Sequence, residues 1–218
     1  MDTLRRHEVF EIEVLERLKN KGLLSPLVFV GGTMLRLCYE LNRYSTDLDF
    51  WFVKKVGLKA YFKKLKDSLG ETYEITDSNI KFNSLLVEVR AKDYPKKLKI
   101  EIRKELKDPD IQDKIAFSRF TTIQVALKAL TLNEAMQSKI KAALDREDIR
   151  DFFDMEFLAR QGAEIKAGKN DLERLKKIIL SFKARDYKVV LGSILEVGQR
   201  RYYVNNGFEY LLTKIKVK

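Results

Sequence analysis

The sequence predicts an α/β protein in which the first half mixes strands with helices and the second half is helical. Short apolar or alternating runs of strand length, such as Leu27–Val30 and Leu98–Arg103, fall mainly in the first half and are separated by helical patterns. From Asn133 onward, apolar residues recur at helical spacing almost to the end. We therefore expect two domains, residues 1–115 and residues 116–218.

The N-terminal elements follow from local patterns. An amphipathic helix is expected over residues 3–21, a buried strand at 27–30 that ends in a Gly-Gly turn, a helix over 33–42 and an aromatic strand at 47–53. Thr33 is the expected N-cap of the second helix. A lysine-rich helix is expected over 57–69, followed by strands at 72–76, 82–91 and 98–103, the last of which alternates with period two.

The C-terminal elements are predicted from helical spacing and from glycines between the helices. After a short strand at 121–126, helices are expected at 133–145, 148–161, 171–183, 186–197 and 207–215.

Composition excludes several kinds of chemistry. The chain has one cysteine, Cys38, and one histidine, His7, which excludes an intramolecular disulfide, a cysteine-rich zinc site and a His-pair metal motif. His7 lies among charged residues, which argues against a histidine-based triad. The chemistry that the composition still permits uses carboxylates, lysines, hydroxyls and hard metal ions.

The charge balance indicates a polyanionic partner. Among 218 residues, 43 are Lys or Arg and 32 are Asp or Glu, giving a formal net charge of +11. No apolar run approaches the roughly 18–20 residues of a membrane span, and the first residues contain no apolar stretch of the signal-peptide type. We therefore expect a cytoplasmic protein that does not bind membranes.

The most informative segment is Gly31–Phe50, GGTMLRLCYELNRYSTDLDF. Alternate residues of a strand face the same side, so Asp47 and Asp49 present two carboxylates together. Two carboxylates this close repel each other, and a divalent cation of the magnesium type relieves that repulsion. The turn at Gly31 and Gly32 offers free backbone N–H groups at a helix start, where phosphate binds favourably. A metal site beside a phosphate site is what nucleotidyl transfer requires.

This ordered set resembles the polymerase-β-like nucleotidyltransferase superfamily, and within it the AbiEii/AbiGii toxin nucleotidyltransferases. Arg43, Ser45 and Asp47–Phe50 match the R-x-S-x-DLDF pattern of that family. A second block, Asn133–Leu158, matches a family helix pair at Glu134, Lys139, Arg146, Arg150, Asp151, Asp154 and Leu158. The third and weakest match is Leu98–Glu105, which resembles the strand that supplies a third carboxylate. The resemblance implies a nucleotidyltransferase fold with a mixed sheet, followed by the helical region.

The resemblance also implies roles for individual residues. Asp47, Asp49 and Glu101 would bind the catalytic Mg²⁺ or Mn²⁺, and Glu101 would orient or deprotonate the attacking hydroxyl. Glu88 on the preceding strand is the rival third carboxylate. The nucleotide-binding set would comprise Gly31, Gly32, Thr33, Ser45, Lys139 and Asp151. In this set Lys139 neutralises triphosphate charge from the helical half, and Asp151 has no assigned chemical step.

The predicted function is transfer of a nucleoside monophosphate from a nucleoside triphosphate onto an acceptor hydroxyl. The resemblance implies a toxin-like role, RNA such as the tRNA 3′ end as acceptor, and an antitoxin encoded nearby. The positive excess is larger in residues 116–218, which suits an RNA backbone. Two alternatives stay open: a metal-dependent nuclease, and a non-catalytic nucleotide- or RNA-binding protein on the same fold.

Overall fold

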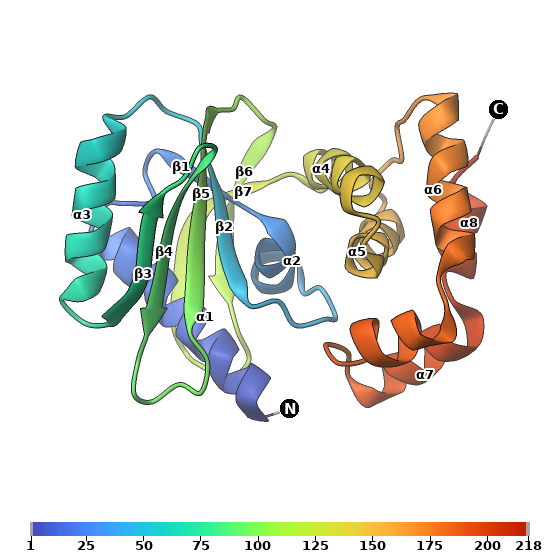
Figure 1. Ribbon diagram of the computed structural model, residues 1–218, viewed down its shortest axis with the longest axis horizontal. Coiled ribbons are helices and arrows are strands. Elements are labelled where there is room, and N and C mark those ends of the chain that lie inside the picture. Colours follow the sequence, from blue (N-terminus) through green and yellow to red (C-terminus); the bar gives the residue numbers. More distant parts are fainter. Residues whose placement is uncertain (1, 217–218) are drawn as a thin grey trace. The chain divides into compact units, whose positions relative to one another are not determined.

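A mixed seven-stranded sheet organises the N-terminal part of the computed structural model, which describes residues 2–216 (Figure 1). The strand order is β3-β4-β5-β2-β1-β7-β6. Pairs β1–β7 and β2–β5 are parallel and the other pairs are antiparallel. The strands are β1 (Leu27–Val30), β2 (Asp47–Phe52), β3 (Glu74–Ile80), β4 (Ser84–Arg90), β5 (Leu98–Leu106), β6 (Ile111–Phe117) and β7 (Gln124–Leu130). The expected α/β class and mixed sheet are confirmed.

Three helices accompany this sheet: α1 (Asp2–Asn20), α2 (Gly31–Tyr39) and α3 (Leu58–Gly70). The core lies between helices and sheet because one face of each central strand is apolar. On that face Phe50 stacks on Phe29 with ring centroids 5.1 Å apart, and Phe52 meets Tyr61 of α3 edge-on at 5.1 Å. Each fully buried phenylalanine stabilises the folded state by about 1.5–3 kcal/mol relative to an exposed one. This packing fixes β2, and with it the opposite face of the sheet.

The chain forms two compact units, and their boundary differs from the one that the sequence predicts. The first unit comprises the chain up to Glu40 together with Tyr44–Leu130, and the second comprises Leu41–Arg43 and the chain from Thr131 onward. Residue 115 lies inside β6, which the sequence pattern did not predict. β6 pairs with β7, and β7 pairs with β1, so both strands belong to the sheet. The units therefore divide after Leu130. Residues 1, 217 and 218 of the predicted domains lie outside the described chain.

The second unit is helical, as expected. Its elements are α4 (Leu132–Arg146), α5 (Ile149–Arg160), α6 (Lys169–Ser181), the π-helical turn η1 (Asp186–Leu191), α7 (Val197–Asn206) and α8 (Glu209–Lys214). The single helix expected over residues 186–197 is instead η1, which ends where the N–H of Gly192 donates to the carbonyl of Tyr187 at 3.0 Å. Apolar spacing does not distinguish this wider turn from an α-helix. Within residues 2–216, no helix is both long and apolar enough to cross a bilayer.

Candidate active site

Two carboxylates of β2 and one of β5 lie on the same face of the sheet. Along β2, Leu48, Phe50 and Phe52 are buried, while Asp47 and Asp49 alternate with them and stay partly exposed. In the parallel pairing of β2 with β5, Asp49 lies opposite Glu101 and Asp47 lies opposite Lys99. Residues opposite each other on neighbouring strands present their side chains to the same face. The face therefore gathers Asp47, Asp49 and Glu101.

A lysine lies between two of these carboxylates. The Nζ atom of Lys99 is 3.3 Å from Oδ2 of Asp47 and 3.4 Å from Oε2 of Glu101. Burial acts to lower the pKa of Lys99, but attraction to Asp47 and Glu101 outweighs it and raises that pKa. The sequence reasoning missed Lys99, although it precedes Glu101 by two residues and the period of a strand puts both on one face.

Glu101 is held as an ionised carboxylate. The Ser84 hydroxyl donates to its Oε1 at 2.8 Å, while Lys99 approaches Oε2. Burial acts to raise the pKa of Glu101, but the hydrogen bond from Ser84 and the charge of Lys99 together lower it. Near neutral pH the Glu101 carboxylate is thus able to bind a cation or to accept a hydrogen bond from a hydroxyl.

The rival carboxylate, Glu88, lies one strand further from β2. It faces Lys99 in the antiparallel pairing of β4 with β5, so it shares the sheet face with Glu101. Its Oε1 accepts from Lys97 at 2.7 Å and from Thr76 at 2.5 Å. Because β4 does not pair with β2, the register favours Glu101 as the neighbour of Asp49.

Gly31 begins α2 directly beside Asp49. Its φ is +82°, and a β-carbon built there would lie 2.8 Å from Oδ2 of Asp49. The residue before it, Val30, pairs with Asp49 in the β1–β2 register. Val30 is the N-cap of α2, and its side chain supplies no hydrogen bond to the first turn of the helix, which begins with the backbone N–H groups of Gly31, Gly32 and Thr33.

The structure corrects the position of Thr33. The sequence predicts Thr33 as the N-cap, but α2 begins two residues earlier because Gly31 adopts a conformation open to glycine. Thr33 is 0% exposed, and its Oγ1 has no hydrogen-bond partner among the described residues. Ser45, also a predicted nucleotide-binding residue, is half-buried in the segment that leads into β2.

The donor set suits a hard cation. Carboxylate oxygens are preferred Mg²⁺ ligands, and Asp47 and Glu101 already share a positive charge in the Lys99 ammonium. Within residues 2–216, no three side chains of the His, Cys, Asp or Glu type are grouped as a ready-made metal site. Binding a metal through all three carboxylates therefore requires their side chains to turn toward one another.

The predicted Lys139 and Asp151 lie together in the helical unit, within a buried network of charges. Lys139 Nζ is 2.6 Å from Oδ2 of Asp154 and 3.0 Å from Oδ1 of Asp151. Arg43 donates to both oxygens of Asp154, at 2.6 and 2.7 Å. Arg146 donates to both oxygens of Asp151, at 3.0 and 2.8 Å. Arg43 of the first family block and Asp154 of the second are thus joined within the helical unit.

Asp154 is the centre of this network. It is 0% exposed. Burial acts to raise the pKa of Asp154, but the charges of Arg43 and Lys139 and their hydrogen bonds outweigh burial and lower it. Arg150 of the same helix pairs with Asp148 and is not part of this network.

His7 is a second residue near the site that the sequence reasoning missed. It is buried on α1, and its Nε2 lies 3.0 Å from the Thr46 carbonyl oxygen, immediately before Asp47. A carbonyl only accepts, so Nε2 carries the proton that is donated. Burial lowers the pKa of His7 against this hydrogen bond, which favours the neutral ring. The charged residues around His7 in the sequence give no indication of this contact, because it joins residues that are 39 positions apart.

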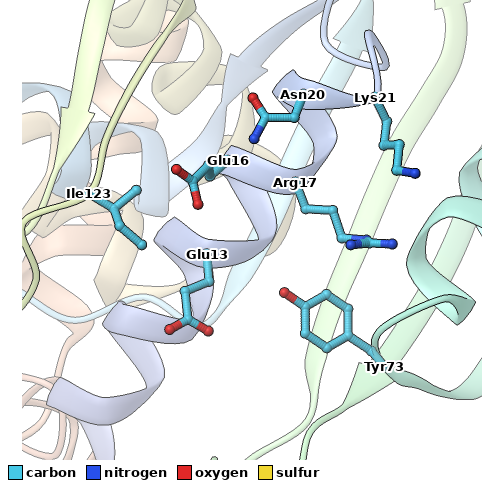
Figure 2. Close-up of a pocket in the computed structure, with 7 residues that line it drawn as sticks. All are labelled: Glu13, Glu16, Arg17, Asn20, Lys21, Tyr73 and Ile123. Carbon is cyan, nitrogen blue, oxygen red and sulfur yellow. The ribbon is translucent and has the colours of Figure 1, made fainter.

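A pocket of about 370 Å³ lies elsewhere on the sheet unit, along α1 (Figure 2). It is lined by Glu13, Glu16, Arg17, Asn20, Lys21, Tyr73 and Ile123. Arg17 and Lys21 both pair with Glu71, at 2.8 and 2.7 Å. None of the predicted site residues lines this pocket, so it is separate from the carboxylate cluster.

The fold of the chain is similar to solved structures of bacterial proteins. JHP933 from Helicobacter pylori superposes with a TM-score of 0.57 at 21% identity, over 95% of this chain and 93% of that one. MenT4, a nucleotidyltransferase toxin from Mycobacterium tuberculosis, superposes with a TM-score of 0.50 at 14% identity, over 98% and 92%. Among curated proteins, no significant match was found.

The family assignment comes from the sequence over most of its length. The model of the AbiEii family, described as the nucleotidyl transferase AbiEii toxin of type IV toxin–antitoxin systems, matches residues 13–202. That range includes every residue of the carboxylate cluster and of the buried charge network. The chain therefore belongs to the AbiEii nucleotidyltransferase toxin family, and its enzymatic class is nucleotidyltransferase.

Proposed function

We propose that this nucleotidyltransferase depends on Mg²⁺ or Mn²⁺ and transfers a nucleoside monophosphate from a nucleoside triphosphate onto a hydroxyl of an RNA acceptor. The tRNA 3′ end is the acceptor to test first. The observation that carries the proposal is the adjacency of Asp49 and Glu101 in the register of β2 and β5, beside the glycine turn at Gly31. Carboxylates beside the backbone N–H groups of a helix start suit a metal-bound triphosphate.

The chain's own residues divide the work. Asp47, Asp49 and Glu101 would hold the cation, which when bound polarises the phosphate oxygens and offsets their charge. The backbone N–H groups at Gly31 and Gly32 would bind triphosphate oxygens. Glu101, whose Oε1 accepts from the Ser84 hydroxyl at 2.8 Å, would orient the acceptor hydroxyl and receive its proton.

The transfer balances without any further reactant. The acceptor oxygen forms a bond to the α-phosphorus while the bond from that phosphorus to the bridging oxygen breaks. Pyrophosphate leaves with the bonding electron pair, and the hydroxyl proton passes to Glu101 and then to water. Positioning and charge stabilisation supply most of the rate enhancement in such reactions.

Residues of the helical unit complete the proposal. Lys139 and Asp151 would assist with triphosphate binding, and Asp154 fixes the Lys139 side chain for that task through the 2.6 Å contact. The net positive charge suits an RNA backbone, and an antitoxin is the expected partner of a toxin of this family. We place the activity in the cytoplasm.

The test is a label-transfer assay with each α-labelled triphosphate in turn, total RNA or tRNA, and Mg²⁺. We expect label on RNA with the wild-type protein and none with Asp49→Asn, whose folding is checked by thermal denaturation. RNA cleavage without any triphosphate would identify a nuclease instead. RNA or nucleotide binding that survives Asp47→Asn and Asp49→Asn, with no transfer by the wild type, would identify a non-catalytic binder.

A further inference from the structure

Lys99 is a charged side chain within the carboxylate cluster that the transfer step itself does not use. It projects from β5 on the face that carries Glu101, and it lies opposite Asp47 in the register. Its Nζ lies within 3.4 Å of a carboxylate oxygen of Asp47 and of a carboxylate oxygen of Glu101. About a third of its side chain is exposed, so the ammonium lies at the rim of the sheet face and not in the core.

The ammonium uses the oxygens that a cation would need. Glu101 has both oxygens engaged, Oε1 by Ser84 and Oε2 by Lys99, and Lys99 also approaches Oδ2 of Asp47. A Mg²⁺ ion binds oxygen at about 2.1 Å, so an ion on these oxygens would lie within a few ångströms of Nζ. At that separation the doubly charged ion and the ammonium repel each other strongly. Both cannot favourably occupy the same oxygens.

The lysine also has a role when no metal is bound. Three neighbouring carboxylates repel one another, and the positive charge of Lys99 offsets part of that repulsion. Lys99 thereby keeps Asp47 and Glu101 turned toward a common point.

We propose that Lys99 is the internal counter-ion of this site, and that a divalent cation must displace its ammonium from Asp47 and Glu101 in order to bind. The inference rests on the proposed function, since it takes Asp47 and Glu101 to be metal-binding carboxylates. Metal binding is then weaker than the carboxylates alone would give. It also moves Lys99, whose stem is long and flexible.

The experiment measures Mn²⁺ binding directly, by the electron paramagnetic resonance signal of free Mn²⁺ during titration of the nucleotide-free protein. Lys99→Met keeps most of the length of the side chain and removes its charge. We expect the variant to bind Mn²⁺ at least about tenfold more tightly than wild type, since a competing charge is removed. Without metal, its melting temperature should fall, and Mn²⁺ should raise it by more than it raises that of wild type.

Lys97→Met is the matched control. Lys97 also pairs with a carboxylate, at 2.7 Å, but that carboxylate is Glu88. Its loss removes the same charge two residues away, so we expect Mn²⁺ affinity within about twofold of wild type, because a separated, exposed charge is screened. If Lys97→Met gained the same tenfold in Mn²⁺ affinity as Lys99→Met, the gain would come from the change in overall charge, and the proposal would be overturned.

The other outcomes separate the inference from the function on which it rests. Wild-type binding of Mn²⁺ with equal or weaker binding by Lys99→Met overturns the counter-ion role and leaves the metal-dependent transferase standing. An absence of Mn²⁺ binding in both proteins removes the metal dependence and the inference together. Adding Asp47→Asn to Lys99→Met should abolish the gain, and a gain that persists would overturn the proposal by placing the competing site elsewhere.

Discussion

Gly31 and Asp49 approach so closely that a β-carbon on residue 31 would lie 2.8 Å from the Asp49 carboxylate. The glycine is required twice, by this contact and by its φ of +82°. The sequence pattern predicts that the glycine turn leaves room for phosphate. In the structure, the Asp49 carboxylate is the group that lies against the turn.

Replacing Gly31 with alanine should therefore damage the site beyond its cost in stability. We expect a loss of about 1–2 kcal/mol from the positive φ and, because Asp49 must move, a fall in transfer of about tenfold or more. Gly22→Ala is the control, since Gly22 has a φ of +69° but a β-carbon there would meet nothing within 4 Å. Urea unfolding and the transfer assay check both. Equal activity of the two variants would contradict the prediction.

Glutamine substitutions should distinguish the two candidate third carboxylates. Glu101→Gln removes the charge opposite Asp49, so transfer should fall about 10²–10³-fold. Glu88→Gln loses only its contacts with Thr76 and Lys97, and transfer should stay within a few-fold of wild type. Initial rates at saturating triphosphate measure both. The reverse order of effects would assign the role to Glu88.

Glu11 should limit stability at neutral and higher pH. It is 1% exposed, and neither carboxylate oxygen has a hydrogen-bond partner among the described residues. Burial raises the pKa of Glu11 well above its usual value, and the charges of Glu8 and Asp47 add to this. The folded state then binds a proton more tightly than the unfolded state, so stability falls as pH rises above the unfolded pKa of about 4.3.

Glu11→Gln should accordingly match wild type near pH 4 and be more stable by about 1–3 kcal/mol at pH 8. Urea unfolding at the two pH values measures the difference. Glu8→Gln is the control on the same helix. Because Glu8 accepts from Arg36 at 2.9 Å and from Ser118 at 2.6 Å, its substitution should destabilise. A Glu11→Gln benefit that is the same at both pH values would show that charge is not its cause.

Asp154→Asn should destabilise the helical unit strongly. It leaves Arg43 and Lys139 buried without their shared carboxylate, and breaking a buried pair costs about 3–5 kcal/mol. Since the pKa of Asp154 is lowered in the folded state, its contribution is full above the unfolded value of about 3.9 and is lost as pH falls through the lower folded value. The difference from wild type should therefore shrink below about pH 4.

Glu147→Gln is the surface control for this measurement. Glu147 pairs with Arg174 at 3.0 Å, with about half of each side chain exposed. Exposed pairs contribute about 0–1 kcal/mol, so unfolding in urea at pH 7 should hardly change. Comparable losses in the two variants would argue against a special role for the buried network.

Local patterns in the sequence sufficed for most of the elements and for the main carboxylates. The alternation of β2 puts Asp47 and Asp49 on one face whatever the rest of the chain does, because strand geometry has period two. The same rule applies to Lys99 and Glu101, so Lys99 was open to prediction. The contact of Lys99 with Asp47 was not predictable, since a pairing between two distant segments depends on which strands become neighbours.

Tertiary structure alone decided the long-range contacts. Arg43 meets Asp154 across 111 residues, and His7 meets Thr46 across 39. β6 belongs to the sheet only because β7 pairs with β1, which moves the boundary between the units from residue 115 to Leu130. Charged side chains such as these look like solvent-exposed positions in a sequence. Their burial is favourable only where the folded chain supplies a partner of opposite charge or a hydrogen-bond acceptor, and periodicity carries no information about that partner.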